Sequence, residues 1–307
     1  MKENIKNFFH KHINNPVLSF MDVLIHRLIN HEVFPKGGQL SYFITLSIFP
    51  FIIAMLNILN FTPLVEPSFL QKILTFLPDS TGNILKTFIQ QISLKSSTSL
   101  LSLSLLTGLW SASSGVRQLI RAINRAYDVP DQRSFLSLAL MGLAFTLGLI
   151  FMIFLLLASN VLGSKAIHDL AEVLNLNTQS VHILSRGLKI TGPIYALAYL
   201  FLLYSFSPSI PYKELHWRTV LPGALFSLLG VFFGTLFFTF YTSNFGNYSV
   251  TYGSLTGIIL FFLWVYLLSV MLLIGGEVNA VLYTKAQSNL HWPREDSLLK
   301  AVMKEGQ

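Results

Sequence analysis

Cysteine is absent from this chain of 307 residues. Its absence excludes disulfide bonds, thiolate metal sites and cysteine nucleophiles. The signatures of several other enzyme classes are missing too, since the sequence contains no Walker loop, no HExxH, no GxSxG and no dinucleotide-binding glycine pattern. We therefore predict no enzymatic activity, no metal and no cofactor, and ATP-driven transport by this chain alone is disfavoured.

Charge is also scarce. Only 11% of the residues are charged, against about 25% in an average soluble protein, while 52% are apolar. This composition predicts an all-α, polytopic integral membrane protein. The net charge of +7 could indicate nucleic-acid binding, but in a membrane protein basic residues mark the cytoplasmic loops. We favour that interpretation and expect no nucleic-acid partner.

Long apolar runs predict six membrane spans. The clearest is 255–276, which carries no charge over 22 residues, enough for a helix rising about 1.5 Å per residue to cross a hydrocarbon core of about 30 Å. The six predicted spans are 38–60, 98–116, 135–162, 181–206, 219–241 and 254–276. Together they form a membrane domain over 38–284.

The flanking segments are polar. Residues 1–37 form an N-terminal segment in which Val17–Phe34 reads as an amphipathic helix lying in the membrane interface, and 285–307 form a short tail. Of the 21 lysines and arginines, 15 fall on the side of the two termini and 6 on the other. The positive-inside rule then places both termini in the cytoplasm of a bacterial inner-membrane protein. We interpret His26 and His31 as interfacial polar residues rather than metal ligands.

The second predicted span has a hydroxyl-rich face. Its members repeat at steps of three or four residues and are Ser104, Thr107, Ser111 and Ser114. The face continues into Arg117, Arg121 and Arg125, which we call the arginine stripe. The stripe either anchors the helix or contacts an anionic headgroup or solute, and the hydroxyls either pack against other helices or line a polar lane together with Gln39 and Tyr42.

Small residues and one acid stand out near the C-terminal end. Two GxxxG spacings predict helix packing, within the chain or between the chains of a homo-oligomer, through Gly230, Gly234, Gly253 and Gly257. Glu277 lies 23 residues after Ser254, roughly 35 Å along a helix, so it should sit at the inner boundary of the last span. We predict that Glu277 pairs there with Arg117 or Arg121.

Several motifs resemble the YihY/BrkB family of bacterial inner-membrane proteins. They are Gly37-Gly38-Gln39-Leu40-Ser41-Tyr42, the segment 113–130, Tyr241, Phe245-Gly246, Tyr248, Tyr252-Gly253-Ser254-Leu255, Trp264 and Gly275-Gly276-Glu277-x-Asn279. The resemblance implies a multi-pass membrane protein without defining its activity. Members have carried a ribonuclease label, which we reject here because we see no paired acids, histidine pair or metal cluster suited to that chemistry.

Two functions remain open from the sequence. The first is a carrier or flippase-like protein for an anionic or amphipathic solute, which would use the arginine stripe and the polar lane. The second is a non-transporting envelope protein that organises lipids or partner proteins through its interfacial helices. Membrane lipids, anionic ones in particular, are the expected partners under both.

Overall fold

A computed structural model describes residues 16–61, 98–153, 178–211, 214–245 and 255–288, and this part of the chain consists of α-helices joined by loops and turns. The all-α prediction is confirmed for these residues. The helices are α2 (Pro16–Asn30), α3 (Val33–Phe61), α6 (Thr98–Ala126), a helix over Phe135–Ile153, α8 (Thr178–Phe206), α9 (Trp217–Phe245) and α11 (Thr256–Gln287).

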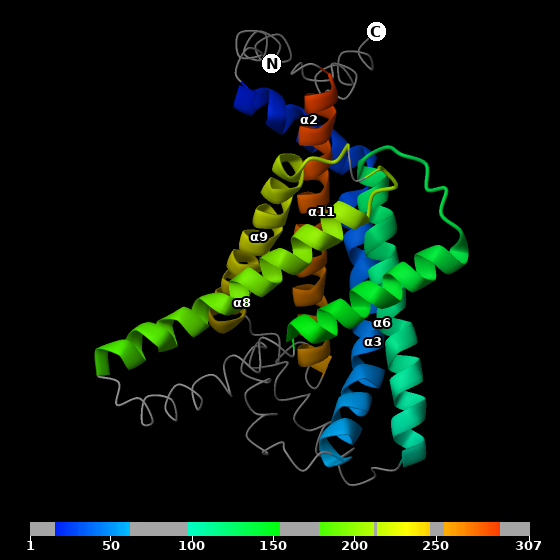
Figure 1. The fold of residues 1–307 in the computed structure, drawn as a ribbon, viewed down its shortest axis with the longest axis vertical. Coiled ribbons are helices and arrows are strands. Elements are labelled where there is room, and N and C mark those ends of the chain that lie inside the picture. Colours follow the sequence, from blue (N-terminus) through cyan, green and yellow to red (C-terminus); the bar gives the residue numbers. More distant parts are fainter. Residues whose placement is uncertain (1–15, 62–97, 154–177, 212–213, 246–254, 289–307) are drawn as a thin grey trace.

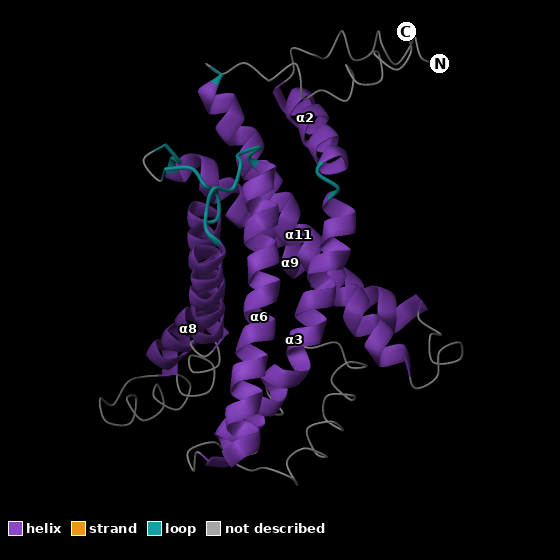
Figure 2. Ribbon diagram, turned by 90° about the vertical axis from the view of Figure 1, so that its right-hand side faces the viewer, coloured by secondary structure: helices purple, strands orange, loops and turns teal. Residues whose placement is uncertain are grey.

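The bundle is organised around α11, which packs against α9, α3, α2 and α6, while α3 packs along α6 and α8 along α9. The two crossed views show α3 and α6 side by side, with α11 close to α9 (Figures 1 and 2). Helix α2 and the C-terminal end of α11 meet at one end of the molecule (Figure 1). We call this the α2 end of the bundle.

The apolar surface of the bundle faces outward. Three helices are long and apolar enough to cross a membrane: Phe135–Ile153, Trp217–Asn244 and Thr256–Gln287. Only 22% of the most apolar window of α9 is buried, and its outer face exposes Phe226, Leu229, Phe232, Phe233, Leu236, Phe237 and Phe240. So large an exposed apolar surface requires a lipid environment. The remaining three predicted spans fall within α3, α6 and α8, so the number of six spans stays a prediction. The end of the predicted span 135–162 lies outside the described residues.

Helix α2 has a buried face and an exposed apolar face, which follow from its sequence periods. Val23, Leu24 and Arg27 are buried, and the two apolar side chains pack with Val278 and Val281 of α11. A second face is apolar but exposed and contains Val17, Met21, Ile25 and Ile29. The predicted amphipathic helix over 17–34 is too long, because α2 ends at Asn30 and α3 already begins at Val33.

The closest helix contact joins α9 to α11. A Cβ at Gly223 would lie 2.1 Å from the Gly275 carbonyl oxygen, and a Cβ at Gly275 would lie 1.9 Å from Ser227 Oγ. The Gly223 backbone N–H donates to Asn279 Oδ1 at 2.7 Å. Only residues without a side chain allow this approach.

Tyr204 of α8 packs against the contact between α9 and α11. Its side chain is fully buried, and its hydroxyl lies 2.6 Å from Ser227 Oγ and donates to the Leu272 carbonyl oxygen at 2.6 Å. A tyrosine can bury its ring at low cost only when the hydroxyl finds such partners. Tyr204 therefore ties α8 to both α9 and α11.

The glycines of the predicted packing motifs make looser contacts. A Cβ at Gly230 would meet Met271 Sδ at 3.0 Å, and one at Gly234 would meet Leu267 at 3.4 Å. Gly257 is buried in α11, and Gly253 lies outside the described residues. Gly230 and Gly234 thus face α11 of the same chain, whereas the tightest approach uses Gly223 and Gly275, which the GxxxG spacing did not indicate.

Candidate functional site

The α2 end of the bundle holds a cluster of four charged side chains, Arg27, His31, Asp128 and Glu277, which we call the polar cluster. His31 Nδ1 lies 2.8 Å from Glu277 Oε1, and His31 Nε2 lies 3.1 Å from Asp128 Oδ1. Arg27 Nη2 lies 3.2 Å from Asp128 Oδ2, and Arg27 Nη1 donates to the Ala126 carbonyl oxygen at 2.8 Å. The cluster joins α2, α11 and the end of α6.

Two turns with left-handed backbone geometry bring these groups together. Glu32, between α2 and α3, has φ 53°, and Asp128, just after α6, has φ 56°. Residues other than glycine seldom adopt this conformation. At Asp128 it ends α6 with an N–H bond to the Arg125 carbonyl oxygen and leaves the carboxylate facing Arg27 and His31.

Both ring nitrogens of His31 face carboxylates, so the protonated imidazolium, which donates from both nitrogens, is the form that fits. The hydrogen bond to Asp128, followed by the one to Glu277, raises the pKa of His31 from its ordinary 6.5 to about 9. The hydrogen bond from His31 in turn lowers the pKa of Asp128. His31 is therefore a cation at neutral pH, placed between two carboxyl groups. Burial raises the pKa of Glu277, and the hydrogen bond from His31 opposes that rise.

The raised pKa of His31 predicts a pH-dependent stability. A group whose folded-state pKa is raised stabilises fully below its unfolded value of 6.5 and loses that contribution as the pH rises through 9. The shift corresponds to about 3 kcal/mol. We expect the melting temperature in detergent to fall between pH 6.5 and pH 9.5, and His31→Gln to flatten this part of the profile. If the melting temperature of His31→Gln falls with pH as steeply as that of the wild type, groups other than His31 cause the fall.

Buried polar atoms surround the cluster. Glu277 is 2% exposed, and its Oε2 finds no hydrogen-bond partner within the described part of the chain; the same holds for the hydroxyls of Tyr127 and Ser207 and for Asn279 Nδ2. A cavity of about 400 Å³ lies beside the cluster and is lined in part by Arg27, Tyr127, Asp128 and Tyr283. Polar cavities of this size hold water.

Asn124 and Asp131 form hydrogen bonds with the loop that follows α6 and the loop that follows α8. Buried Asn124 donates to the Val129 carbonyl oxygen at 2.9 Å and accepts from the Ser209 N–H at 2.6 Å. Asp131 accepts from Arg133 and from the Ser209 hydroxyl, and the hydrogen bond from Arg133 is the main reason that the pKa of Asp131 is lowered. The segments 127–134 and 207–211 are thus tied together at the α2 end.

The arginine stripe lies along the last third of α6. Arg117 is partly buried, donates to Ser113 Oγ at 2.7 Å and to Ser114 Oγ at 2.6 Å, and stacks on Trp110 with 5.2 Å to the ring centroid. Arg121 and Arg125 are exposed. None of the three forms an ion pair with a carboxylate of the described residues. Lys36 lies close enough to Arg125 for their charges to repel.

Glu277 pairs with His31 instead of the arginines. The predicted pairing of Glu277 with Arg117 or Arg121 is therefore wrong, since Arg117 turns toward the hydroxyls of its own helix. Glu277 lies in the last third of α11, and its position at the inner boundary of the membrane stays a prediction.

The residues of the predicted polar lane differ in exposure where the structure describes their side chains. Gln39, Tyr42 and Thr107 are exposed, and Ser111 is partly buried. Thr107 and Ser114 donate back to the Leu103 and Trp110 carbonyl oxygens one turn earlier. The side chain of Ser104 lies outside the described part. Hydroxyls on a helix that bond to the preceding turn need no ligand or neighbouring helix.

The apolar outer faces, the buried ionisable cluster and the helices long enough to span define an α-helical integral membrane protein. Residues 24–298 match the family model described as virulence factor BrkB, and the chain belongs to that family. This confirms the resemblance found in the sequence motifs.

Two relatives cover most of the chain. The ribonuclease-like protein YfkH of Bacillus subtilis is 33% identical over 268 residues, which span 87% of this chain and 96% of the relative. A UPF0761 membrane protein of Vibrio atlanticus is 24% identical over 297 residues, 92% of this chain and 89% of the relative. No solved structure matches.

Sequence reasoning missed Arg27 and His31 as site residues. His31 is 246 positions from Glu277 and 97 from Asp128, and no local pattern connects residues so far apart. The only local signal was that both lie at the end of an amphipathic helix directly before a span. We had interpreted such residues as interfacial.

Proposed function

We propose that the protein is a six-span carrier or flippase-like protein of the bacterial inner membrane that moves an anionic or amphipathic solute. The observation that carries the proposal is the arginine stripe, whose three guanidinium groups have no carboxylate partner among the described residues. Unpaired cations at the edge of an apolar bundle favour anions, because arginine binds phosphate and carboxylate with charge-assisted, often paired hydrogen bonds.

Arg117 is the stripe residue that lies farthest from the C-terminal end of α6. Its guanidinium is held by Ser113 and Ser114 and by the Trp110 ring, which orders the side chain before any ligand arrives. Arg121 and Arg125 continue the positive charge outward along the same helix face. An anion that approaches from the α2 end meets Arg125 first and Arg117 last.

Transport in liposomes tests this proposal. Purified protein reconstituted with fluorescent phosphatidylglycerol should accelerate its movement between leaflets, measured by dithionite quenching, and Arg121→Gln/Arg125→Gln should reduce the rate at least tenfold. Arg218→Gln is the matched control, because Arg218 lies at the start of α9 against Trp217, away from the stripe. Equal rates for wild type, the double variant and empty liposomes would refute lipid transport.

The topology in this proposal has both termini in the cytoplasm. The chain has no cysteine, so a single introduced cysteine is the only residue of this protein that a maleimide labels. In intact cells, a membrane-impermeant maleimide should label Ser243→Cys at the end of α9, but not Gln132→Cys or Ser288→Cys at the α2 end. Labelling of the last two from outside would invert the topology.

One observation favours the second function, a non-transporting envelope protein that organises lipids or partner proteins. The exposed apolar face of α2, formed by Val17, Met21, Ile25 and Ile29, fits a helix that lies in the membrane interface. If reconstituted protein moves no lipid and a stable partner is recovered only when this face is intact, this second function replaces the carrier.

A further inference from the structure

A second site lies on the opposite side of the loops from the polar cluster. An open groove of about 750 Å³ runs between the start of the helix Phe135–Ile153 and the end of α8. It is lined by Gln132, Arg133, Ser137, Met141, Phe145, Phe206, Pro208, Ser209, Ile210 and Pro211. Its volume is in the range of small-molecule binding sites.

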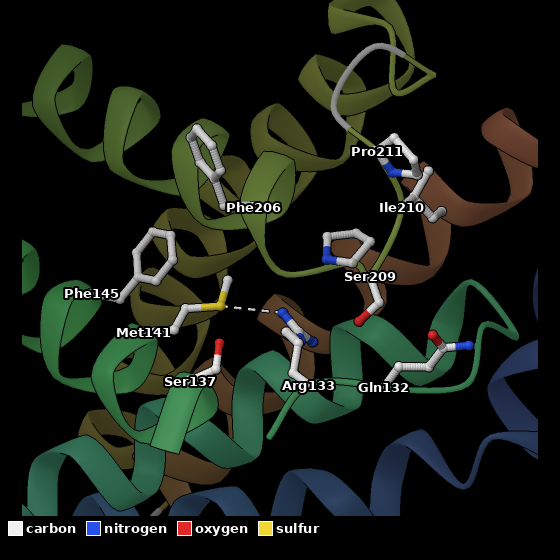
Figure 3. Close-up of a pocket in the computed structure, with 10 residues that line it drawn as sticks. Gln132, Arg133, Ser137, Met141, Phe145, Phe206, Ser209, Ile210 and Pro211 are labelled. Carbon is white, nitrogen blue, oxygen red and sulfur yellow. Dashed lines mark hydrogen bonds between the residues drawn. The ribbon is translucent and has the colours of Figure 1, made fainter. Parts of the chain in front are cut away.

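The groove has a mixed end, where polar Gln132 and Ser209 lie beside Pro208, Ile210 and Pro211, and an apolar end. In Figure 3, Gln132 and Ser209 lie on one side, Phe145 and Phe206 on the other, and Arg133 stands between them next to Met141. Met141 and Phe145 extend from the helix Phe135–Ile153, and Phe206 extends from the end of α8. The first of these helices has an exposed apolar surface at its start, where Phe135 and Leu136 are 69% and 66% exposed. The groove therefore opens beside the start of an apolar helix that is long enough to cross a membrane.

Arg133 is held in place with one donor group left for a ligand. Its Nε and Nη2 donate to Asp131 at 2.7 Å and 2.9 Å, which fixes the plane of the guanidinium. Its Nη1 faces Met141 Sδ at 3.2 Å, and a thioether is only a weak acceptor. A phosphate oxygen in the groove would be a far stronger acceptor for Nη1.

The carboxylate of Asp131 is the group that opposes anion binding. Its oxygens accept from Arg133 and from Ser209, so much of its charge is already compensated. The N-terminus of the following helix lies beside Arg133, and its first turn is capped where Ser137 N–H donates to Ser134 Oγ. The positive end of that helix adds to the attraction for an anion.

We propose that this groove binds one anionic phospholipid, with a phosphate oxygen on Arg133 Nη1 and an acyl chain along Met141, Phe145 and Phe206. A water-soluble phosphate would use only the mixed end and leave the apolar wall in water, so the groove as a whole favours the lipid. None of the three stripe arginines lines the groove, although Arg117 packs against Gly142, next to Met141. Lipid binding here requires no transport.

Native mass spectrometry in detergent tests the proposal on the full chain. Wild type should retain one phosphatidylglycerol in preference to phosphatidylcholine, and Arg133→Gln should weaken this binding at least tenfold. Arg218→Gln, outside the groove, and Arg121→Gln/Arg125→Gln, in the stripe, should both bind as wild type. Loss of lipid only in the stripe variant would overturn this site while supporting the proposed function.

A second readout does not depend on Arg133. A bimane fluorophore on Ser137→Cys should be quenched by brominated phosphatidylglycerol, and Met141→Phe, which does not quench bimane, should in that background reduce the quenching by filling the apolar end. Glycerol 3-phosphate at millimolar concentration should not compete. Equal quenching with and without Met141→Phe, or full competition by glycerol 3-phosphate, would overturn the assignment of a phospholipid.

Discussion

Replacing Gly275 with alanine is expected to prevent stable folding. The new Cβ would lie 1.9 Å from Ser227 Oγ, 2.7 Å from the Gly223 carbonyl oxygen and 2.8 Å from the Tyr204 hydroxyl. Because the Gly223 contact is with backbone, α9 and α11 must move apart, and the bonds of Tyr204 to Ser227 and Leu272 are then strained or lost. We expect a loss of about 3 kcal/mol or more from overpacking and broken buried hydrogen bonds.

The measurement is fluorescence-detected size exclusion after heating in detergent. The matched control is Gly234→Ala in the same pair of helices, where the nearest atoms to the new Cβ are Leu267 side-chain atoms at 3.4 and 3.5 Å. This control should melt near wild type. If Gly275→Ala also melts near the wild-type temperature, α9 and α11 do not approach each other as closely at Gly275 as described.

Replacing His31 with alanine is the second large effect. It removes the hydrogen-bonded cation beside Glu277, whose side chain is only 3% exposed, and leaves an unpaired carboxylate in a buried place. Breaking one side of a buried ion pair costs about 3–5 kcal/mol. We expect His31→Ala to lower the melting temperature in detergent at pH 7 more than any other single histidine replacement.

A double-mutant cycle separates this effect from lost packing. Glu277→Gln removes the buried charge, so His31→Ala/Glu277→Gln should be more stable than the sum of the two single changes predicts. His26→Ala is the control, because His26 lies in α2, five residues before His31, but bonds only to exposed Asn30 in the contacts described. Strict additivity of the two changes would show that His31 and Glu277 do not interact.

The sequence was sufficient for the all-α class and for the three most apolar helices, because long apolar runs are visible without any tertiary information. The boundaries shifted where a helix continued beyond the bilayer: the run predicted as 98–116 extends in α6 to Ala126 and carries the arginine stripe with it. A membrane span is recognised by its apolar residues, whereas a helix continues for as long as its backbone hydrogen bonding does. The last turns of α6 are polar and still helical.

The partners within the site could not be predicted, for two physical reasons. Contacts such as His31 with Glu277 depend on which helices are neighbours, and nothing in an isolated helix specifies that. Serine and threonine can satisfy their hydroxyls on their own helix, as Thr107 does with Leu103, so a hydroxyl-rich face does not by itself indicate a lane. The GxxxG spacing likewise missed Gly223, whose contact depends on Asn279 of another helix.

The polar cluster also has a consequence for the order of assembly. Arg27 and His31 are synthesised early, whereas Glu277 follows His31 by 246 positions. Helix α2 therefore leaves the ribosome long before its buried acidic partner exists, and its docking waits until the last helix has been inserted. A chain that stops before α11 would leave the apolar side chains Val23 and Leu24 without the α11 residues Val278 and Val281 on which they pack.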